Sequence, residues 1–150
     1  MRRTLLISSA ALLLAAATAH AATPEDAIKY RKAVMSTMAG HINAITLIFT
    51  GRVEHEKFLL SHAEALAVGG EQMGVLFPAG SDVGRTEALP AIWQEPEKFA
   101  KAVEQSRLAT AGLRDAIRTG DKAAIGKAMK PVADSCKGCH DRYRKEEQSM

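Results

Sequence analysis

The sequence is poor in aromatic residues, cysteine and proline, and each shortage excludes a class of protein. Among 150 residues, aromatics make up 5%, and there are two cysteines and five prolines. Two cysteines cannot form the disulfide framework of a small secreted domain, and so little proline and glycine excludes a collagen-like chain. With 47% hydrophobic and 25% charged residues, the chain is too apolar for a disordered protein and fits one compact domain.

The chain also lacks a strong charge of one sign. Its formal net charge is +3, and Arg2 and Arg3 lie in a segment that we expect to be removed. Their removal takes two from the 20 Lys and Arg residues and leaves 18 against 17 Asp and Glu. Because nucleic-acid-binding domains carry a clear excess of basic residues, we expect no nucleic-acid partner.

Long hydrophobic runs are missing except at the N-terminus. Two arginines precede an apolar run over residues 5–17, and Ala19-His20-Ala21 then places small residues where a signal peptidase reads. The run is about 13 residues long, well short of the roughly 20 that a membrane-spanning helix needs. We therefore predict a secretory signal peptide over residues 1–21 and a mature domain over residues 22–150, located in the periplasm without a membrane span.

The mature chain is patterned for helices. Apolar residues recur at spacings of three, four and seven, which places them on one face of a helix. Four segments show this spacing: 24–50, 53–77, 96–120 and 121–143. Thr23 and Pro24 are typical of a helix start, and Gly51, Pro78 and Gly120 of helix ends. The sequence predicts an all-α fold, an antiparallel four-helix bundle.

One longer connection interrupts this pattern. Residues 78–94 carry two prolines and two glycines without helical periodicity, so we predict a crossover loop there. Within this loop, Ile92 and Trp93 are expected to pack into the core. Pro131, inside the last segment, predicts a local bend in that helix.

The strongest motif lies near the C-terminus, where Cys136, Cys139 and His140 form a CxxCH sequence. Cysteines three positions apart share a helix face. Two such thiols can form thioethers with the vinyl groups of one porphyrin, which brings the adjacent imidazole beneath the iron. We therefore predict one covalent haem c, attached through Cys136 and Cys139, with His140 as an axial iron ligand.

Two other interpretations of the cysteine pair remain. A zinc site would need two further ligands, available only from His41, His55, His62 or a carboxylate, and none has paired spacing with the cysteines. A thioredoxin-like redox pair needs a strand-to-helix context that a helical chain lacks. Haem attachment is favoured over both, and the three histidines are expected at the surface or in satisfied interfaces.

Arg31 occupies a position on the apolar face of the first segment that Met38 and Ile45 otherwise fill. A cation there needs an anionic partner. A haem propionate is the natural one, because a guanidinium can grip it with two hydrogen bonds. The alternative is that Arg31 reaches water at the end of the bundle or pairs with a carboxylate. Met38 and Met73 are expected to fill the core.

The chain resembles a known family, the cytochromes c′ or class II c-type cytochromes, over the whole mature length. The resemblance rests on residues 26–31 (DAIKYR), Phe77, residues 90–93 (PAIW) and residues 135–144 (SCKGCHDRYR). It implies a four-helix bundle holding one haem, with His140 as the proximal ligand. It also implies a five-coordinate iron that binds NO and CO, and often a homodimer.

The resemblance assigns further residues to the haem by position. It places Arg31 and Lys32 near the propionates, and Arg144 beside the proximal face. Phe77 and Met35 match distal positions. Thr86 and Glu87 match the haem edge, in a crossover loop that is longer here than in the family pattern.

Met35 separates two functions. In low-spin relatives with the same bundle, a methionine of the first helix ligates the iron. An open iron favours binding of diatomic gases, whereas a Met35-ligated, six-coordinate iron favours one-electron transfer to redox partner proteins. The likeness to cytochrome c′ favours the five-coordinate state. No Ser-His-Asp or paired-carboxylate arrangement points to an enzyme.

Overall fold

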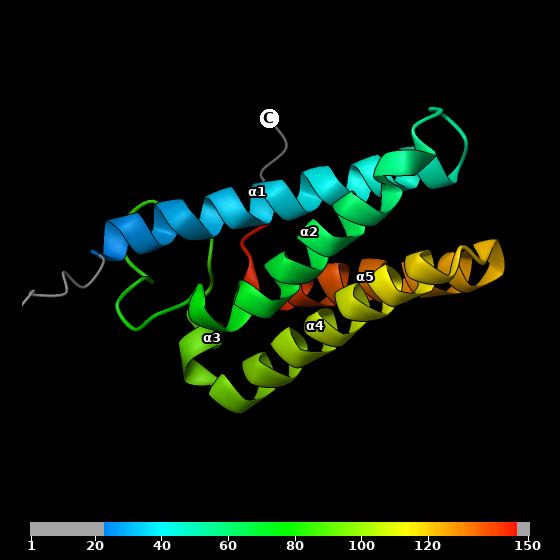
Figure 1. Cartoon of the computed structure of the whole chain (residues 1–150). Coiled ribbons are helices and arrows are strands. Elements are labelled where there is room, and N and C mark those ends of the chain that lie inside the picture. Colours follow the sequence, from blue (N-terminus) through cyan, green and yellow to red (C-terminus); the bar gives the residue numbers. More distant parts are fainter. Residues whose placement is uncertain (1–22, 147–150) are drawn as a thin grey trace, which may run out of the picture.

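The computed structural model describes residues 23–146, which form an antiparallel bundle of four long helices (Figure 1). The long helices are α1 (Pro24–Phe49), α2 (Leu59–Gln72), α4 (Pro96–Thr119) and α5 (Lys122–Tyr143). The short elements are η1 (Glu56–Phe58), η2 (Met73–Val75) and α3 (Ala91–Gln94). The predicted all-α four-helix bundle is therefore confirmed. The predicted signal peptide, residues 1–21, lies outside the described residues.

Three of the helix ends follow from local residues. The hydroxyl of Thr23 accepts a hydrogen bond from the backbone N–H of Asp26 at 3.2 Å, which caps α1. The carboxylate of Asp121 accepts one from the N–H of Ala123 at 2.8 Å, which caps α5. Gly120 ends α4 with a φ of 71°, a conformation that glycine adopts without strain.

The second helix departs from its predicted bounds of 53–77. It begins with η1 and becomes an α-helix only at Leu59, because residues 50–55 are needed to reverse the chain after Gly51, which has a φ of 69°. Its last turn is the 3₁₀ helix η2. The crossover loop contains the short helix α3, in which Ile92 is buried. Pro131 lies within the continuous helix α5.

The helices pack in chain order. The α1 helix lies against α2, α2 against α4, and α4 against α5. Their shared core includes Met38, Ile45, Leu66, Leu113 and Val132, all buried. Methionines 38 and 73 fill this core as predicted. Within the described part of the chain, no helix is both long and apolar enough to cross a bilayer.

A glycine lets α2 and α4 approach closely. A Cβ atom on Gly70 would lie 2.3 Å from Oγ1 of Thr110, a fully buried side chain whose hydroxyl donates to the Ser106 carbonyl at 3.0 Å. We expect Gly70→Ala to destabilise the protein by about 1–3 kcal/mol through overpacking. Gly112→Ala is the control, because a methyl group there meets nothing within 4 Å. It should stabilise by about 0.5–1 kcal/mol through helix propensity.

Urea unfolding of the purified protein measures both changes. If the two alanine variants shifted the unfolding free energy in the same direction, the close approach at Gly70 would not be a constraint on the sequence.

Candidate functional site

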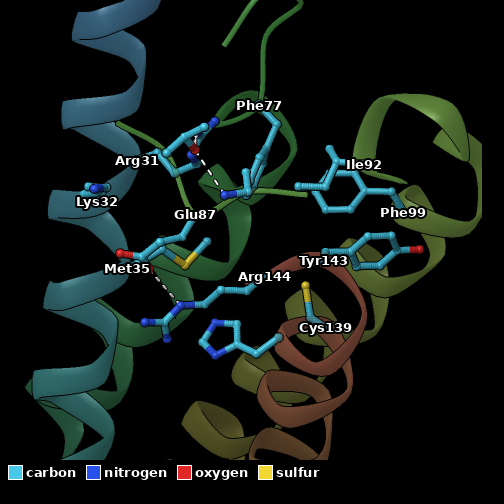
Figure 2. Close-up of a pocket in the computed structure, with 13 residues that line it drawn as sticks. Arg31, Lys32, Met35, Phe77, Glu87, Ile92, Phe99, Cys139, Tyr143 and Arg144 are labelled. Carbon is cyan, nitrogen blue, oxygen red and sulfur yellow. Dashed lines mark hydrogen bonds and ion pairs between the residues drawn. The ribbon is translucent and has the colours of Figure 1, made fainter. Parts of the chain in front are cut away.

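A cavity of about 520 Å³, including the part open to solvent, lies between α1 and α5 beside α3 (Figure 2). Nine of the ten site residues predicted from the sequence line it: Arg31, Lys32, Met35, Phe77, Thr86, Glu87, Cys139, His140 and Arg144. The tenth, Cys136, lies one turn before Cys139 on α5 and packs against the main core. The structure thus brings the predicted residues to one place, while their roles remain predictions.

The two cysteines are free thiols, each partly buried. Burial raises the pKa of Cys136, and burial together with the neighbouring Cys136 raises the pKa of Cys139 to about 11. Both thiols are therefore protonated at neutral pH, whereas a redox-active CxxC pair has a lowered pKa. The two thiols therefore do not match a redox-exchange pair.

The zinc interpretation finds no support either. Within residues 23–146, no group of three or more His, Cys, Asp and Glu side chains is placed to hold a metal ion. His55 is exposed in the turn before η1.

His140 lines the cavity next to Cys139. Its pKa is lowered, first by burial and then by the positive charge of Arg144, while Asp141 opposes the shift. The neutral imidazole that results is the form that can ligate a metal. The donor set of two thiols and one imidazole on a single helix is the set that c-type haem attachment uses.

Much of the cavity wall is apolar. Figure 2 shows the Met35 side chain reaching into the cavity from α1, on the side away from Cys139. The rings of Phe77 and Phe99 meet edge to face, with their centroids 4.9 Å apart. The rings of Phe99 and Tyr143 do the same, with their centroids 5.2 Å apart. Such pairs are worth about 0.5–1.5 kcal/mol each and hold the rings in fixed orientations. An apolar, rigid wall facing thiols and an imidazole fits a haem, which is mostly apolar.

Arg31 is 5% exposed and binds the crossover loop. Its Nη1 donates to the Leu76 carbonyl at 3.2 Å and to Ser81 Oγ at 3.0 Å. Its Nη2 donates to the Ser81 carbonyl at 3.0 Å and to Thr86 Oγ1 at 2.7 Å. The guanidinium carbon also lies 4.7 Å from the centre of the Phe77 ring. Burial lowers the pKa of Arg31.

These contacts bear on both alternatives for Arg31. The side chain does not extend to water, because it is buried, and no carboxylate of residues 23–146 pairs with it. All four Nη hydrogens have acceptors, three in the crossover loop and one at Leu76 just before it. A two-pronged grip on a propionate would require two of these bonds to break. The contact with a propionate therefore stays a prediction.

The crossover loop is also fastened to the end of α5. The N–H of Leu89 donates to the Tyr143 carbonyl at 2.9 Å, and the N–H of Lys145 donates to the Glu87 carbonyl at 2.8 Å. These bonds flank an isolated antiparallel bridge between Ala88 and Arg144. Arg144 also pairs with Glu87, with Nε and Oε2 3.0 Å apart (Figure 2). The loop thus ties α1 to α5 across the cavity.

Sequence reasoning missed some residues of this site. Phe99 and Tyr143 line the cavity but are not among the predicted site residues. For Tyr143, its position four residues after Cys139 on the same helix was a usable signal. Ser81 is fully buried and receives Arg31, yet nothing in its neighbourhood distinguishes it from any other loop serine.

Comparison with known proteins gives concordant matches. The family profile described as Cytochrome C' matches residues 26–144. The cytochrome c′ of Rhodospirillum rubrum is 33% identical over 145 residues, covering 96% of this chain and 99% of that protein. The structure of cytochrome c prime from Shewanella frigidimarina superposes with a TM-score of 0.79 at 31% identity, covering 85% of this chain and 100% of the other.

Some of the similar structures carry diatomic ligands. A ferrous variant of the Alcaligenes xylosoxidans protein with bound NO is 29% identical, with a TM-score of 0.77, and covers 85% of this chain and 100% of its own. A carbon monoxide-bound variant of the same protein is 30% identical, with a TM-score of 0.76, and covers 83% of this chain and 98% of its own.

Proposed function

Because the chain belongs to the cytochrome c′ family, whose members carry covalently attached haem c, we propose that it is an exported haem protein that binds NO or CO. In this proposal Cys136 and Cys139 hold the haem covalently and His140 ligates its iron. The haem supplies one coordination position for a diatomic gas and a one-electron couple. The observation that carries the proposal is that Met35, Phe77 and Phe99 give the cavity an apolar wall beside Cys139 and His140.

Two of the charged groups near that wall are already engaged. Arg31 donates its Nη hydrogens to the crossover loop, and Glu87 is paired with Arg144. A distal side formed by Met35 and Phe77 presents no hydrogen-bond donor to a bound ligand and restricts the entry of water. Such a pocket suits small neutral gases better than ligands that acquire negative charge. The similar proteins with bound NO and CO support the same assignment.

The alternative function is electron transfer with Met35 as the sixth ligand. It is favoured by one observation, which is that the Met35 side chain reaches into the cavity (Figure 2). A thioether ligand would close the iron to gases and lower the reorganisation that accompanies one-electron exchange with a partner protein.

A visible absorption spectrum of the ferrous protein, with and without CO, separates these functions. We expect a broad high-spin spectrum, ready CO binding, and a change mainly in gas affinity in Met35→Leu. Met38→Leu is the matched control, because Met38 lies on the same helix but packs in the main core. A sharp low-spin spectrum that is lost in Met35→Leu and kept in Met38→Leu would make the protein an electron carrier instead.

The rest of the proposal concerns the protein's location, oligomeric state and partners. The leader over residues 1–21 supports removal on export and residence in the periplasm. The likeness to cytochrome c′ supports a homodimer and contact with redox partner proteins. The relatives named above are cytochromes, and we assign the chain no catalytic role.

A further inference from the structure

Two histidines meet outside the haem cavity. His41 lies on α1 and His62 on α2, and their Nδ1 atoms are 3.0 Å apart. The ring centroids are 5.3 Å apart and the ring planes are inclined by 52°. Neither ring lines the cavity, and neither is used in the proposed function.

Both rings sit at the margin of the packed interface between α1 and α2. Buried Met38 and Ile45 lie three residues before and four residues after His41, and buried Ala63 follows His62 directly. The two histidines themselves are only partly buried. The helix backbones are therefore fixed by apolar packing, while the rings stay within reach of solvent.

We propose that His41 and His62 form a binding site for a divalent transition-metal ion, with Cu²⁺ as the preferred ion. Metal–nitrogen bonds to imidazole are about 2.0–2.1 Å long, so nitrogens 3.0 Å apart subtend roughly 91–97° at a shared ion. That is the angle between adjacent ligands in square-planar or tetragonal coordination, the geometry of Cu²⁺ and Ni²⁺. A tetrahedral ion such as Zn²⁺ would require the nitrogens to be about 3.3–3.4 Å apart.

Binding requires a shift of one proton and no oxidation. In the metal-free pair, one Nδ1–H donates to the other Nδ1. When both Nδ1 atoms ligate the ion, the donor ring moves its proton to Nε2 through water, and both rings remain neutral. Burial and the neighbouring His62 lower the pKa of His41, so the neutral form prevails at neutral pH.

The rest of the coordination sphere is water. Within residues 23–146, no Cys, Asp, Glu or further His joins the pair to make a three-ligand group. The site is therefore open and exchangeable, and the general order of divalent affinities places Cu²⁺ above Ni²⁺ and Zn²⁺.

Calorimetric titration of the mature, haem-loaded protein with CuSO₄, in a buffer that does not coordinate copper, tests the proposal. We expect one Cu²⁺ per chain, binding at least tenfold more weakly in either His41→Gln or His62→Gln. Electron paramagnetic resonance of the loaded protein should show coupling to two imidazole nitrogens. His55→Gln is the matched control, because His55 is exposed and its ring contacts Phe58 rather than either histidine of the pair. This variant should bind Cu²⁺ as the unchanged protein does.

The haem spectrum and the helical circular dichroism of each variant establish that it is folded. Equal Cu²⁺ affinity in the unchanged protein and both pair variants would overturn the proposal. Loss of binding in His55→Gln, or the absence of a one-to-one complex in the unchanged protein, would also overturn it.

Discussion

Replacing Cys136 and Cys139 together by alanine is expected to leave a protein without covalent haem and to destabilise it by about 2–5 kcal/mol. The stability loss follows because the cavity between α1 and α5 is lined by apolar side chains that the haem would cover, and an unfilled apolar cavity costs as much as a large-to-small core substitution. Mass spectrometry under denaturing conditions measures attachment, and thermal unfolding measures stability. The same mass reports whether the mature chain begins at Ala22.

Ser135→Ala is the control for this pair. Ser135 precedes the motif and its hydroxyl donates to the Val132 carbonyl at 2.9 Å, so its loss should cost at most about 1 kcal/mol and leave the haem in place. A haem mass on the denatured double variant would contradict attachment through these two thiols. Unchanged thermal unfolding would contradict the role of the haem in filling the cavity.

Arg31→Met should have the second largest effect, about 2–4 kcal/mol of destabilisation. The change leaves the carbonyls of Leu76 and Ser81 without the donor that they share, and both residues are buried. The cost is smaller than the sum of four hydrogen bonds, because the methionine also removes a cation held away from water. Urea unfolding measures the loss, and limited proteolysis should cut the crossover loop faster.

Two further variants make the result specific. Lys32→Met removes the neighbouring cation, which is exposed and lines the same cavity, and should change stability little. Arg31→Lys keeps the charge but lacks the planar fork that reaches Ser81 and Thr86 at once, so it should resemble Arg31→Met. If Arg31→Lys were as stable as the unchanged protein, charge rather than the hydrogen bonds to the loop would be what the site requires.

The parts of the fold that the sequence predicts are those set by local interactions. Thr23 and Asp121 cap their helices through backbone atoms two or three residues away, and Gly120 ends α4 through its own φ angle. The CxxCH motif is equally local, because its spacing alone places both cysteines on one face of α5. The start of α2 at Leu59 was predicted too early, since apolar spacing does not show where a chain must reverse.

What could not be predicted depends on contacts between distant segments. The partners of Arg31 lie 45 to 55 residues away, in or just before a loop without periodicity, so the sequence indicates that a partner is needed but not which one. The meeting of His41 and His62 depends on how α1 and α2 are rotated about their axes, which spacing within one helix does not fix. Thr86 and Glu87 were reached only through the resemblance to a family.

Opening of the cavity can be followed by hydrogen exchange at the bridge between the crossover loop and the end of α5. Its two amide protons, on Leu89 and Lys145, are held by carbonyls on the opposite segment, so neither can exchange with deuterium until the two segments part. Both segments contribute to the cavity wall, through Ala88 and Arg144. The exchange rates of these two protons therefore record how often the wall opens, without a ligand or any change to the chain.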